Sequence, residues 1–284
     1  MLVAVNSYSQ KMIPLYEGKV PGSEDWDYEE IWFKVDDWGG EKLTRNVVDP
    51  TLEVFMPEIS QTTGTAVIVC PGGGNHYLEY EKEGTVVAEW LANKGITAFV
   101  LKYRVHKTLE TNEDFVKWYD DRMNRPRAAR ESNNPTVPQL PARNFGGEDG
   151  IKAIEYVREN YNKYGIDPDK VGIMGFSAGA GVTMYVILNS SPEKQPNFAA
   201  PIYGRWRIGS EVPENAPPIF IACTANDRVA FSSPDLFKAW REAGKSAELH
   251  IYSKGAHGFG MRQTGLPVNT WFDRYYDWLK AEGF

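Results

Sequence analysis

The sequence predicts a doubly wound α/β fold with a mostly parallel sheet, and three observations carry this prediction. Apolar, strand-like runs such as TAVIVC (65–70) and KVGIMG (170–175) alternate with segments whose apolar residues recur at helical spacing. Glycine follows several of the expected helices, and no internal repeat or low-complexity tract interrupts the alternation. Strands that alternate with helices of about 10–15 residues pair in parallel through right-handed crossovers. We therefore expect one domain over residues 1–284.

The expected elements follow in chain order. The N-terminal third has strand patterns at 31–37 and 52–57 around a turn signal at Gly39-Gly40, and these predict an antiparallel strand region. Further strands are expected at 65–70, 96–103, 170–175, 197–204, 218–227 and 247–253. Helices are expected at 83–95, 147–165, 177–190, 233–245 and 269–282.

One long segment, residues 104–144, interrupts the alternation of strands and helices. It contains four prolines and mixed charge between an expected strand and an expected helix. Irregular stretches of this length within a compact domain are usually functional or disordered. Its place beside the expected active-site face favours an irregular lid or pocket wall, and a solvated excursion without function is the alternative.

Composition and charge narrow the possible partners. The net charge is −7 and no basic cluster is present, which argues against nucleic acid and anionic lipid as ligands. No stretch approaches the ~20 apolar residues of a membrane span, and the N-terminus lacks the pattern of a signal peptide. We expect a cytoplasmic protein, or a secreted or periplasmic one if an export signal was removed. The sequence indicates no oligomeric state.

The two cysteines, Cys70 and Cys223, each lie in an apolar strand-like run, where a free thiol behaves as a small hydrophobe. Their spacing does not fit a zinc site, and a disulfide between them is the less favoured alternative. We expect no metal and no organic cofactor.

The stretch GIMGFSAGAG (172–181) places a G-x-S-x-G motif between an expected strand and an expected helix. In this context the serine occupies a strained strand-to-helix turn that exposes its oxygen above the sheet. Small neighbours are required because backbone segments approach closely there. The motif therefore predicts Ser177 as a nucleophile.

A serine nucleophile needs a base and an acid. His257, in KGAHGFG after the last strand, has the position that the chain order Ser…Asp/Glu…His requires, whereas His250 lies within a strand and is expected to be structural. Asp227 ends the strand 218–227, where catalytic groups gather in such sheets. Its competitor Asp235 falls in the first turn of a helix, where the helix dipole explains an acid. We predict that Asp227 orients His257.

The developing oxyanion needs hydrogen-bond donors. The loop CPGGGNH follows an early strand, and its glycines allow backbone amides to turn toward an oxyanion. We predict donors at Gly73, Gly74 and Ala178, the residue after the nucleophile. A flexible turn or a phosphate-binding loop is the alternative, but the spacing of a dinucleotide fingerprint is missing.

Four stretches together resemble the acetylxylan-esterase and feruloyl-esterase-like branch of the α/β-hydrolases: CPGGGNHYLEYEKEGTVVAEWLANKGITAFVLKYR, YGIDPDKVGIMGFSAGA, TANDRVA and AELHIYSKGAHGFG. The resemblance covers roughly residues 45–284. It implies an α/β-hydrolase fold and a serine esterase that removes acetyl or hydroxycinnamoyl groups from plant polysaccharide fragments. The sequence departs from the family pattern after the glycines, where Asn75-His76-Tyr77 replaces a directly following aromatic residue, and after Asp227.

The substrate is expected to be a small or oligosaccharide ester. Candidate substrate contacts are Asn75, His76, Tyr77, Trp118 and Tyr119, with packing as the alternative role of the aromatic rings. Two other functions remain open at this point. A serine peptidase of the same fold would share the triad, and a non-catalytic binding protein would usually lack one of its members.

Overall fold

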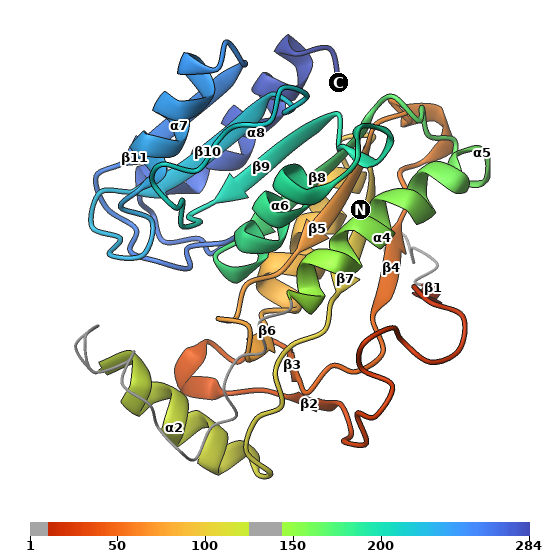
Figure 1. The fold of residues 1–284 in the computed structure, drawn as a ribbon. Coiled ribbons are helices and arrows are strands. Elements are labelled where there is room, and N and C mark those ends of the chain that lie inside the picture. The colour runs from red at the N-terminus through yellow and green to blue at the C-terminus, as the bar shows by residue number, and fades with distance from the viewer. Residues whose placement is uncertain (1–10, 125–143) are drawn as a thin grey trace, which may run out of the picture.

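The computed structural model describes residues 11–124 and 144–284. In this part of the chain the large sheet has eight strands, in the spatial order β1 (Lys11–Pro14), β4 (Thr51–Phe55), β7 (Thr97–Lys102), β5 (Ala66–Cys70), β8 (Val171–Phe176), β9 (Phe198–Ile202), β10 (Ile219–Thr224) and β11 (Ala247–Tyr252) (Figure 1). Strand β4 pairs antiparallel with both β1 and β7, and the remaining neighbours pair in parallel. The predicted mostly parallel sheet with antiparallel N-terminal strands is confirmed.

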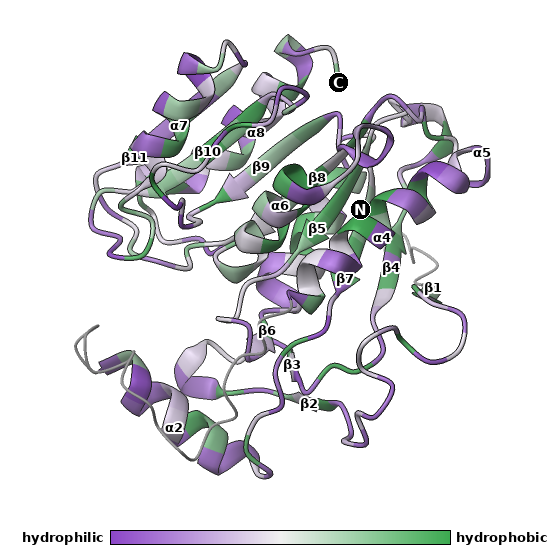
Figure 2. Cartoon of the chain, in the orientation of Figure 1, coloured by the Kyte–Doolittle hydropathy of each residue, from purple (hydrophilic) through white to green (hydrophobic). Residues whose placement is uncertain are grey.

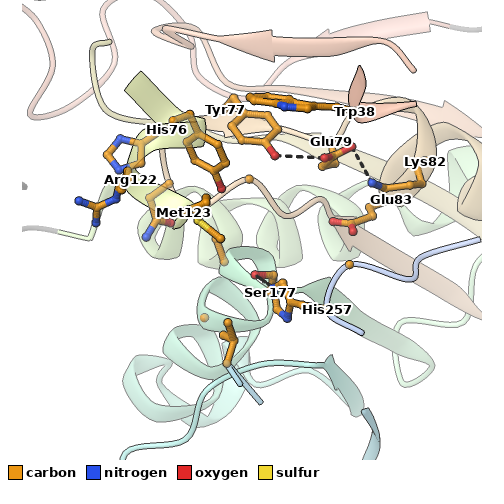
Figure 3. A pocket seen from close by; sticks show the side chains of 18 of the residues that line it. Trp38, His76, Tyr77, Glu79, Lys82, Glu83, Arg122, Met123, Ser177 and His257 are labelled. Atoms are coloured by element: carbon orange, nitrogen blue, oxygen red, sulfur yellow. Dashed lines mark hydrogen bonds and ion pairs between the residues drawn. The ribbon is translucent and has the colours of Figure 1, made fainter. Parts of the chain in front are cut away.

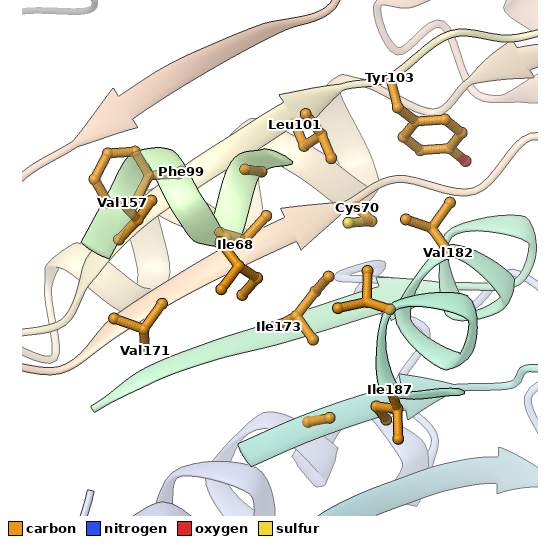
Figure 4. Close-up of a cluster of buried hydrophobic side chains, with 14 of the residues drawn as sticks. Ile68, Cys70, Phe99, Leu101, Tyr103, Val157, Val171, Ile173, Val182 and Ile187 are labelled. Carbon is orange, nitrogen blue, oxygen red and sulfur yellow. The ribbon is translucent and has the colours of Figure 1, made fainter. Parts of the chain in front are cut away.

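The sheet is buried on both faces, which explains the continuous apolar runs of its central strands. In β5, Ala66, Ile68 and Cys70 face one hydrophobic cluster, and Val67 and Val69 face the other. Helices α4, α6 and α7 contribute side chains to the first cluster, and α1 and α8 to the second. Figure 4 shows side chains of the first cluster converging between the sheet and its helices, and Figure 2 shows β5 and β8 largely in hydrophobic green.

The helices of the described residues are α1 (Val86–Ala92), α2 (Asn112–Asn124), α4 (Phe145–Glu159), α5 (Tyr161–Tyr164), α6 (Ala178–Asn189), α7 (Ser233–Glu242) and α8 (Trp271–Ala281). The expected helix at 83–95 begins earlier, with a π-helical turn at Glu81–Thr85. The expected helix at 147–165 is interrupted at Asn160, so that α5 is a separate turn closed by left-handed Gly165. The expected strand at 31–37 is also shorter. It ends at Phe33, and residues Asp36–Trp38 form a 3-10 turn.

A second, antiparallel sheet lies at the end of the large sheet where the parallel strands finish (Figure 1). It consists of β2 (Ile31–Phe33), β3 (Leu43–Arg45) and β6 (Tyr77–Leu78). The sequence indicated only the first of these strands. Strands of two or three residues are too short for a period of two to be recognised.

The expectation of an irregular excursion is wrong for part of residues 104–144, because α2 occupies Asn112–Asn124. Thr111 starts this helix: its hydroxyl accepts the amide hydrogen bond of Asp114 (3.1 Å) and donates to the carboxylate of Asp114 (2.7 Å). Phe115 is completely buried and packs with Phe33, Leu43 and Tyr77 in a small apolar cluster. Residues 104–111 of the predicted lid form no helix or strand, and residues 125–143 lie outside the described residues.

A buried ion pair joins the end of β7 to α4. The guanidinium of Arg104 donates to Asp149 at 2.7 and 3.1 Å, and both side chains are inaccessible to solvent. The same guanidinium donates to the carbonyl of Pro21 (2.8 Å) and to the hydroxyl of Ser23 (3.0 Å). The N-terminal segment is thereby anchored to the large sheet.

Candidate active site

Ser177 lies on a strained turn between β8 and α6. Its φ of 52° and ψ of −109° are unusual for a residue with a side chain, and such strain persists only where the surroundings impose it. A Cβ at Gly175 would lie 2.0 Å from the carbonyl oxygen of Gly179, and one at Gly179 would lie 2.0 Å from that of Cys70. The turn therefore requires glycine at both positions, and it presents the serine hydroxyl at the carboxyl end of the sheet.

Ser177, His257 and Asp227 form a continuous chain of hydrogen bonds. Ser177 Oγ lies 2.8 Å from His257 Nε2, and His257 Nδ1 lies 2.7 Å from Asp227 Oδ2. The Asp227 carboxylate is fully buried and also accepts hydrogen bonds from the amides of Val229 (2.7 Å) and Ala230 (3.2 Å). This geometry allows the imidazole to take the serine proton while the aspartate holds the ring.

The contacts of Asp227 keep it ionised. Burial raises its pKa, but the hydrogen bond and charge of His257 and the amides of Val229 and Ala230 outweigh burial, so the pKa lies below its usual range. A charged carboxylate at this position would stabilise a protonated His257 imidazole.

The loop that carries His257 is fixed at its preceding residue. Ala256 has a left-handed φ of 58°; its amide donates to Asn226 Oδ1 (3.0 Å), and its carbonyl accepts from Thr224 Oγ1 (3.1 Å). Thr224 and Asn226 come from the end of β10, the strand that also leads to Asp227. The end of one strand therefore positions both Asp227 and His257.

The glycine loop after β5 lies beside Ser177. Gly73 has a φ of 130°, and a Cβ there would lie 1.9 Å from the carbonyl oxygen of Tyr77. Among the described residues, none accepts a hydrogen bond from the amides of Gly73 or Gly74, and both residues line the pocket with Ser177 and Ala178. Ala178 is the first residue of α6, so its amide belongs to the open first turn of the helix.

A pocket of about 650 Å³ opens above Ser177 and His257. Figure 3 shows these two residues on one side and Trp38, Tyr77 and Glu79 on the opposite side. The predicted substrate contacts Asn75, His76, Tyr77 and Tyr119 line this pocket. Trp118 packs behind the wall instead, with its ring 5.0 Å from that of His76 and against Phe115.

The predicted contacts differ in what they can offer a ligand. Tyr77 donates its hydroxyl to Glu79 Oε1 at 3.1 Å. His76 is buried, and burial together with the charges of His106 and Arg122 lowers its pKa to about 3, so its ring is neutral at pH 7. Asn75 adopts a left-handed φ of 65°, and its carbonyl accepts the amide hydrogen bond of His106 (2.9 Å).

Several lining residues were not identified individually from the sequence, although four of them lie in the segment 104–144 that was predicted as a lid or pocket wall. They are Trp38, Glu79, Lys82, Glu83, Asp120, Arg122, Met123, Asn144, Gly181, Val182, Arg205, Val229, Gly258 and Arg262. Trp38 comes from a distant N-terminal turn, and its indole donates to Asp120 of α2 (3.0 Å). No local pattern links these two segments. The acidic run YLEYEKEG directly after the glycine loop was a usable signal for Glu79 and Glu83.

Glu79, Lys82 and Glu83 place three buried charged groups in the pocket wall. Lys82 Nζ lies 3.0 Å from Glu79 Oε2. Burial raises the pKa of Glu83 and the neighbouring Glu79 raises it further, while Lys82 and the hydrogen bonds from Tyr203 and Gly72 oppose this rise. The site therefore combines aromatic rings with polar groups, a composition suited to a hydroxylated ligand.

Residues 11–124 and 144–284 contain no group of three or more histidine, cysteine, aspartate or glutamate side chains arranged to hold a metal ion. Cys70 and Cys223 are buried free thiols. In the same ranges, no helix has both the length and the apolar character needed to cross a membrane.

The fold and the site define a class of protein. A mostly parallel sheet whose central strand leads into a serine elbow, followed by an acid and a histidine on later strand ends, characterises hydrolases and esterases of the α/β type. The chain belongs to the dienelactone hydrolase family, whose sequence profile matches residues 54–276.

Two curated proteins are similar to this chain over part of their length, and their names describe an esterase and a xylanase. An acetylxylan esterase from Xylanibacter ruminicola is 28% identical over 285 residues, an alignment that covers 84% of this chain and 50% of the relative. Endo-1,4-beta-xylanase B from Butyrivibrio fibrisolvens is 25% identical over 233 residues, covering 68% of this chain and 32% of the relative. The chain thus spans about half the length, or less, of these curated relatives.

Solved structures share the fold. The acetyl ester-xyloside bifunctional hydrolase from Caldicellulosiruptor lactoaceticus superposes with a TM-score of 0.64 at 23% identity, over 96% of this chain and 97% of that one. An α/β hydrolase from a Medee basin deep-sea metagenome library gives 0.63 at 20% identity, with the same coverage. At these identities the likeness to solved structures establishes the fold alone.

Proposed function

We propose that this protein is a serine carboxylic-ester hydrolase that deacylates acetylated or feruloylated plant polysaccharide fragments through an acyl-enzyme. The observation that carries the proposal is the unbroken hydrogen-bond chain from Ser177 Oγ through His257 to Asp227, beside the glycine loop. The polar and aromatic pocket wall and the acetylxylan esterase relative support a sugar ester as substrate.

In the first half of the reaction, Ser177 Oγ attacks the ester carbonyl while its proton passes to His257 Nε2. The oxyanion of the tetrahedral intermediate accepts hydrogen bonds from the amides of Ala178 and the glycines at 73 and 74. His257 then donates its proton to the leaving alcohol, which departs and leaves the acyl group on Ser177.

In the second half, His257 takes a proton from water as its oxygen attacks the acyl carbonyl. A second tetrahedral intermediate collapses, the carboxylic acid leaves, and the proton returns to Ser177 Oγ. Asp227 remains ionised throughout and holds the Nδ1–H of the imidazole. No step requires a group beyond the three side chains, the amides and water.

The test compares wild type with Ser177→Ala on p-nitrophenyl acetate. We expect wild-type turnover and its loss in the variant, whereas equal rates would refute the serine mechanism. Acetylated xylo-oligosaccharides, methyl ferulate and a peptide amide then identify the substrate. Fastest turnover of the acetylated oligosaccharides supports the acetyl ester, fastest turnover of methyl ferulate supports the feruloyl ester, and preference for the peptide amide would refute the esterase assignment.

A further inference from the structure

Glu83 is a buried carboxylate that the proposed reaction does not use. Its exposed fraction is 2%, and both of its oxygens are engaged by groups from other parts of the chain. Oε2 accepts the amide hydrogen bond of Gly72 (2.9 Å), and Oε1 accepts the hydroxyl hydrogen bond of Tyr203 (2.6 Å). Burying a carboxylate is costly unless it is hydrogen-bonded, so these two contacts are what keeps Glu83 in place.

The first contact connects Glu83 to the glycine loop. Gly72 lies between the carboxylate and the elbow: a Cβ at this position would lie 2.5 Å from Glu83 Oε2 and 3.2 Å from Ser177 Cβ. The next two residues, Gly73 and Gly74, supply the amides proposed for the oxyanion. A hydrogen bond to the amide of Gly72 therefore fixes the peptide that precedes these donors.

The second contact connects Glu83 to the surroundings of the base. Tyr203 is completely buried and follows β9 with a left-handed φ of 37°. Its ring meets the ring of His257 edge-on, with centroids 5.1 Å apart. The loop that carries His257 also approaches Glu83 directly. A Cβ at Gly260 of this loop would lie 3.3 Å from Glu83 Cγ.

We propose that Glu83 is a positioning residue for the tetrahedral oxyanion, since its carboxylate holds the glycine loop and, through Tyr203, the ring of His257 in one fixed arrangement. The role rests on the proposed ester hydrolysis. Glu83 lines the pocket, but in this role it acts through Gly72 and Tyr203 and not on the reacting atoms themselves. Removing the Glu83 carboxylate leaves the amide donors and His257 present but less well aligned. The free energy of the transition state should therefore rise more than that of the bound ester.

Two readouts separate this role from a merely structural one. One is the division of kinetic effects between kcat and KM for p-nitrophenyl acetate. The other is the inhibition constant of phenylboronic acid, which forms a tetrahedral adduct on a serine oxygen and so reports on the oxyanion site. Thermal unfolding of each variant measures any loss of stability independently.

Four variants complete the design. For Glu83→Ala we expect a fall in kcat of about 10- to 100-fold, smaller than the loss of about 10²–10³ on deleting an oxyanion donor, because the donors remain. KM stays within about twofold, and phenylboronic acid binds more weakly by a factor similar to that for kcat. Tyr203→Phe keeps the ring but loses the hydroxyl, and should have a smaller effect of the same kind.

Glu83→Gln serves as the conservative rescue. Its amide oxygen still accepts from Gly72 and its amide nitrogen donates to the Tyr203 oxygen, so it retains most of the activity. Glu89→Ala is the matched control, because Glu89 is an exposed carboxylate on the adjoining helix α1. It should match wild type in every readout.

The outcomes are distinguishable. Unchanged kcat and boronic acid inhibition in both Glu83→Ala and Tyr203→Phe, with an active wild type, would refute the role of Glu83 alone. If Glu83→Ala does not fold, Tyr203→Phe decides: a parallel loss in kcat and boronic acid affinity at unchanged KM supports the proposal, and no loss overturns it. An inactive wild type would refute the proposed function, and this role with it.

Discussion

Acidification should destabilise this protein through two histidines beside the pocket. His76 is 4% exposed, and its Nδ1 has no hydrogen-bond partner among the described residues. Burial, then the charges of His106 and Arg122, lower the pKa of His76 to about 3, and burial lowers the pKa of His106 to about 4. In the unfolded chain both pKa values return to about 6.5. Between about pH 4 and pH 6.5, both histidines are therefore neutral in the folded protein and protonated in the unfolded chain.

The sign and size of the effect follow from this difference. Below pH 6.5 the unfolded chain binds more protons than the folded one, so the free energy of unfolding falls as the pH falls. The loss continues until the pH reaches the folded pKa. At about 1.4 kcal/mol per pH unit, His76 accounts for a loss of about 2 kcal/mol between pH 7 and pH 5. His106 is only partly buried and contributes less.

The assay is urea unfolding at pH 7, 6 and 5 on wild type, His76→Asn and Phe115→Leu. His76→Asn loses packing against Trp118 and is less stable at pH 7, but its loss between pH 7 and pH 5 should be smaller than that of wild type by about 2 kcal/mol. Phe115→Leu also loosens packing against Trp118, but it changes no titrating group and should retain the wild-type pH dependence. An identical pH dependence in His76→Asn and wild type would refute the reasoning.

Three further predictions concern single contacts. Asp227→Asn removes the charge that holds the imidazole, and should lower kcat on p-nitrophenyl acetate by about 10⁴-fold with little change in melting temperature; activity within tenfold of wild type would contradict this. Gly73→Ala forces a Cβ within 1.9 Å of the Tyr77 carbonyl oxygen, so we expect kcat to fall by at least about 10²-fold, and a near-wild-type rate would show that the loop is dispensable. Asp149→Ala leaves Arg104 buried without its partner and should lower the free energy of unfolding in urea by about 3–5 kcal/mol, a result that an unchanged midpoint would exclude.

The sequence predicts those parts of the molecule whose cause is local. Strands β5, β7, β8, β9 and β10 are buried along their whole length, so each appears as an apolar run, and the helices between them end at glycines or polar turns. Ser177, Asp227 and His257 are identifiable because an elbow needs small neighbours and because strand ends carry the acid and the base. The structure brings the three side chains within hydrogen-bond distance, while their catalytic roles stay predictions.

The features that the sequence does not reveal depend on contacts between distant segments. Trp38 reaches the pocket because a short 3-10 turn directs it toward Asp120, and nothing near Trp38 in the chain specifies that partner. Helix α2 was not predicted, because its sequence has mixed charge and prolines follow it, although Phe115 and Tyr119 have helical spacing. Glu83 resembles an ordinary acid in the first turn of a helix until the structure places Gly72 and Tyr203 against it.

The interlocking of the elbow with the glycine loop has a consequence for altering substrate choice by mutation. The carbonyl of Cys70 occupies the space that a side chain at position 179 would need, and the carbonyl of Gly179 does the same for position 175. The backbone that holds Ser177 therefore tolerates no added side chain at positions 175 and 179. Trp38, Tyr119 and Arg205 line the pocket from separate elements, and we expect recognition of the ester to depend on such side chains. A mutant library confined to those three positions can change which ester is accepted while the reacting groups stay intact.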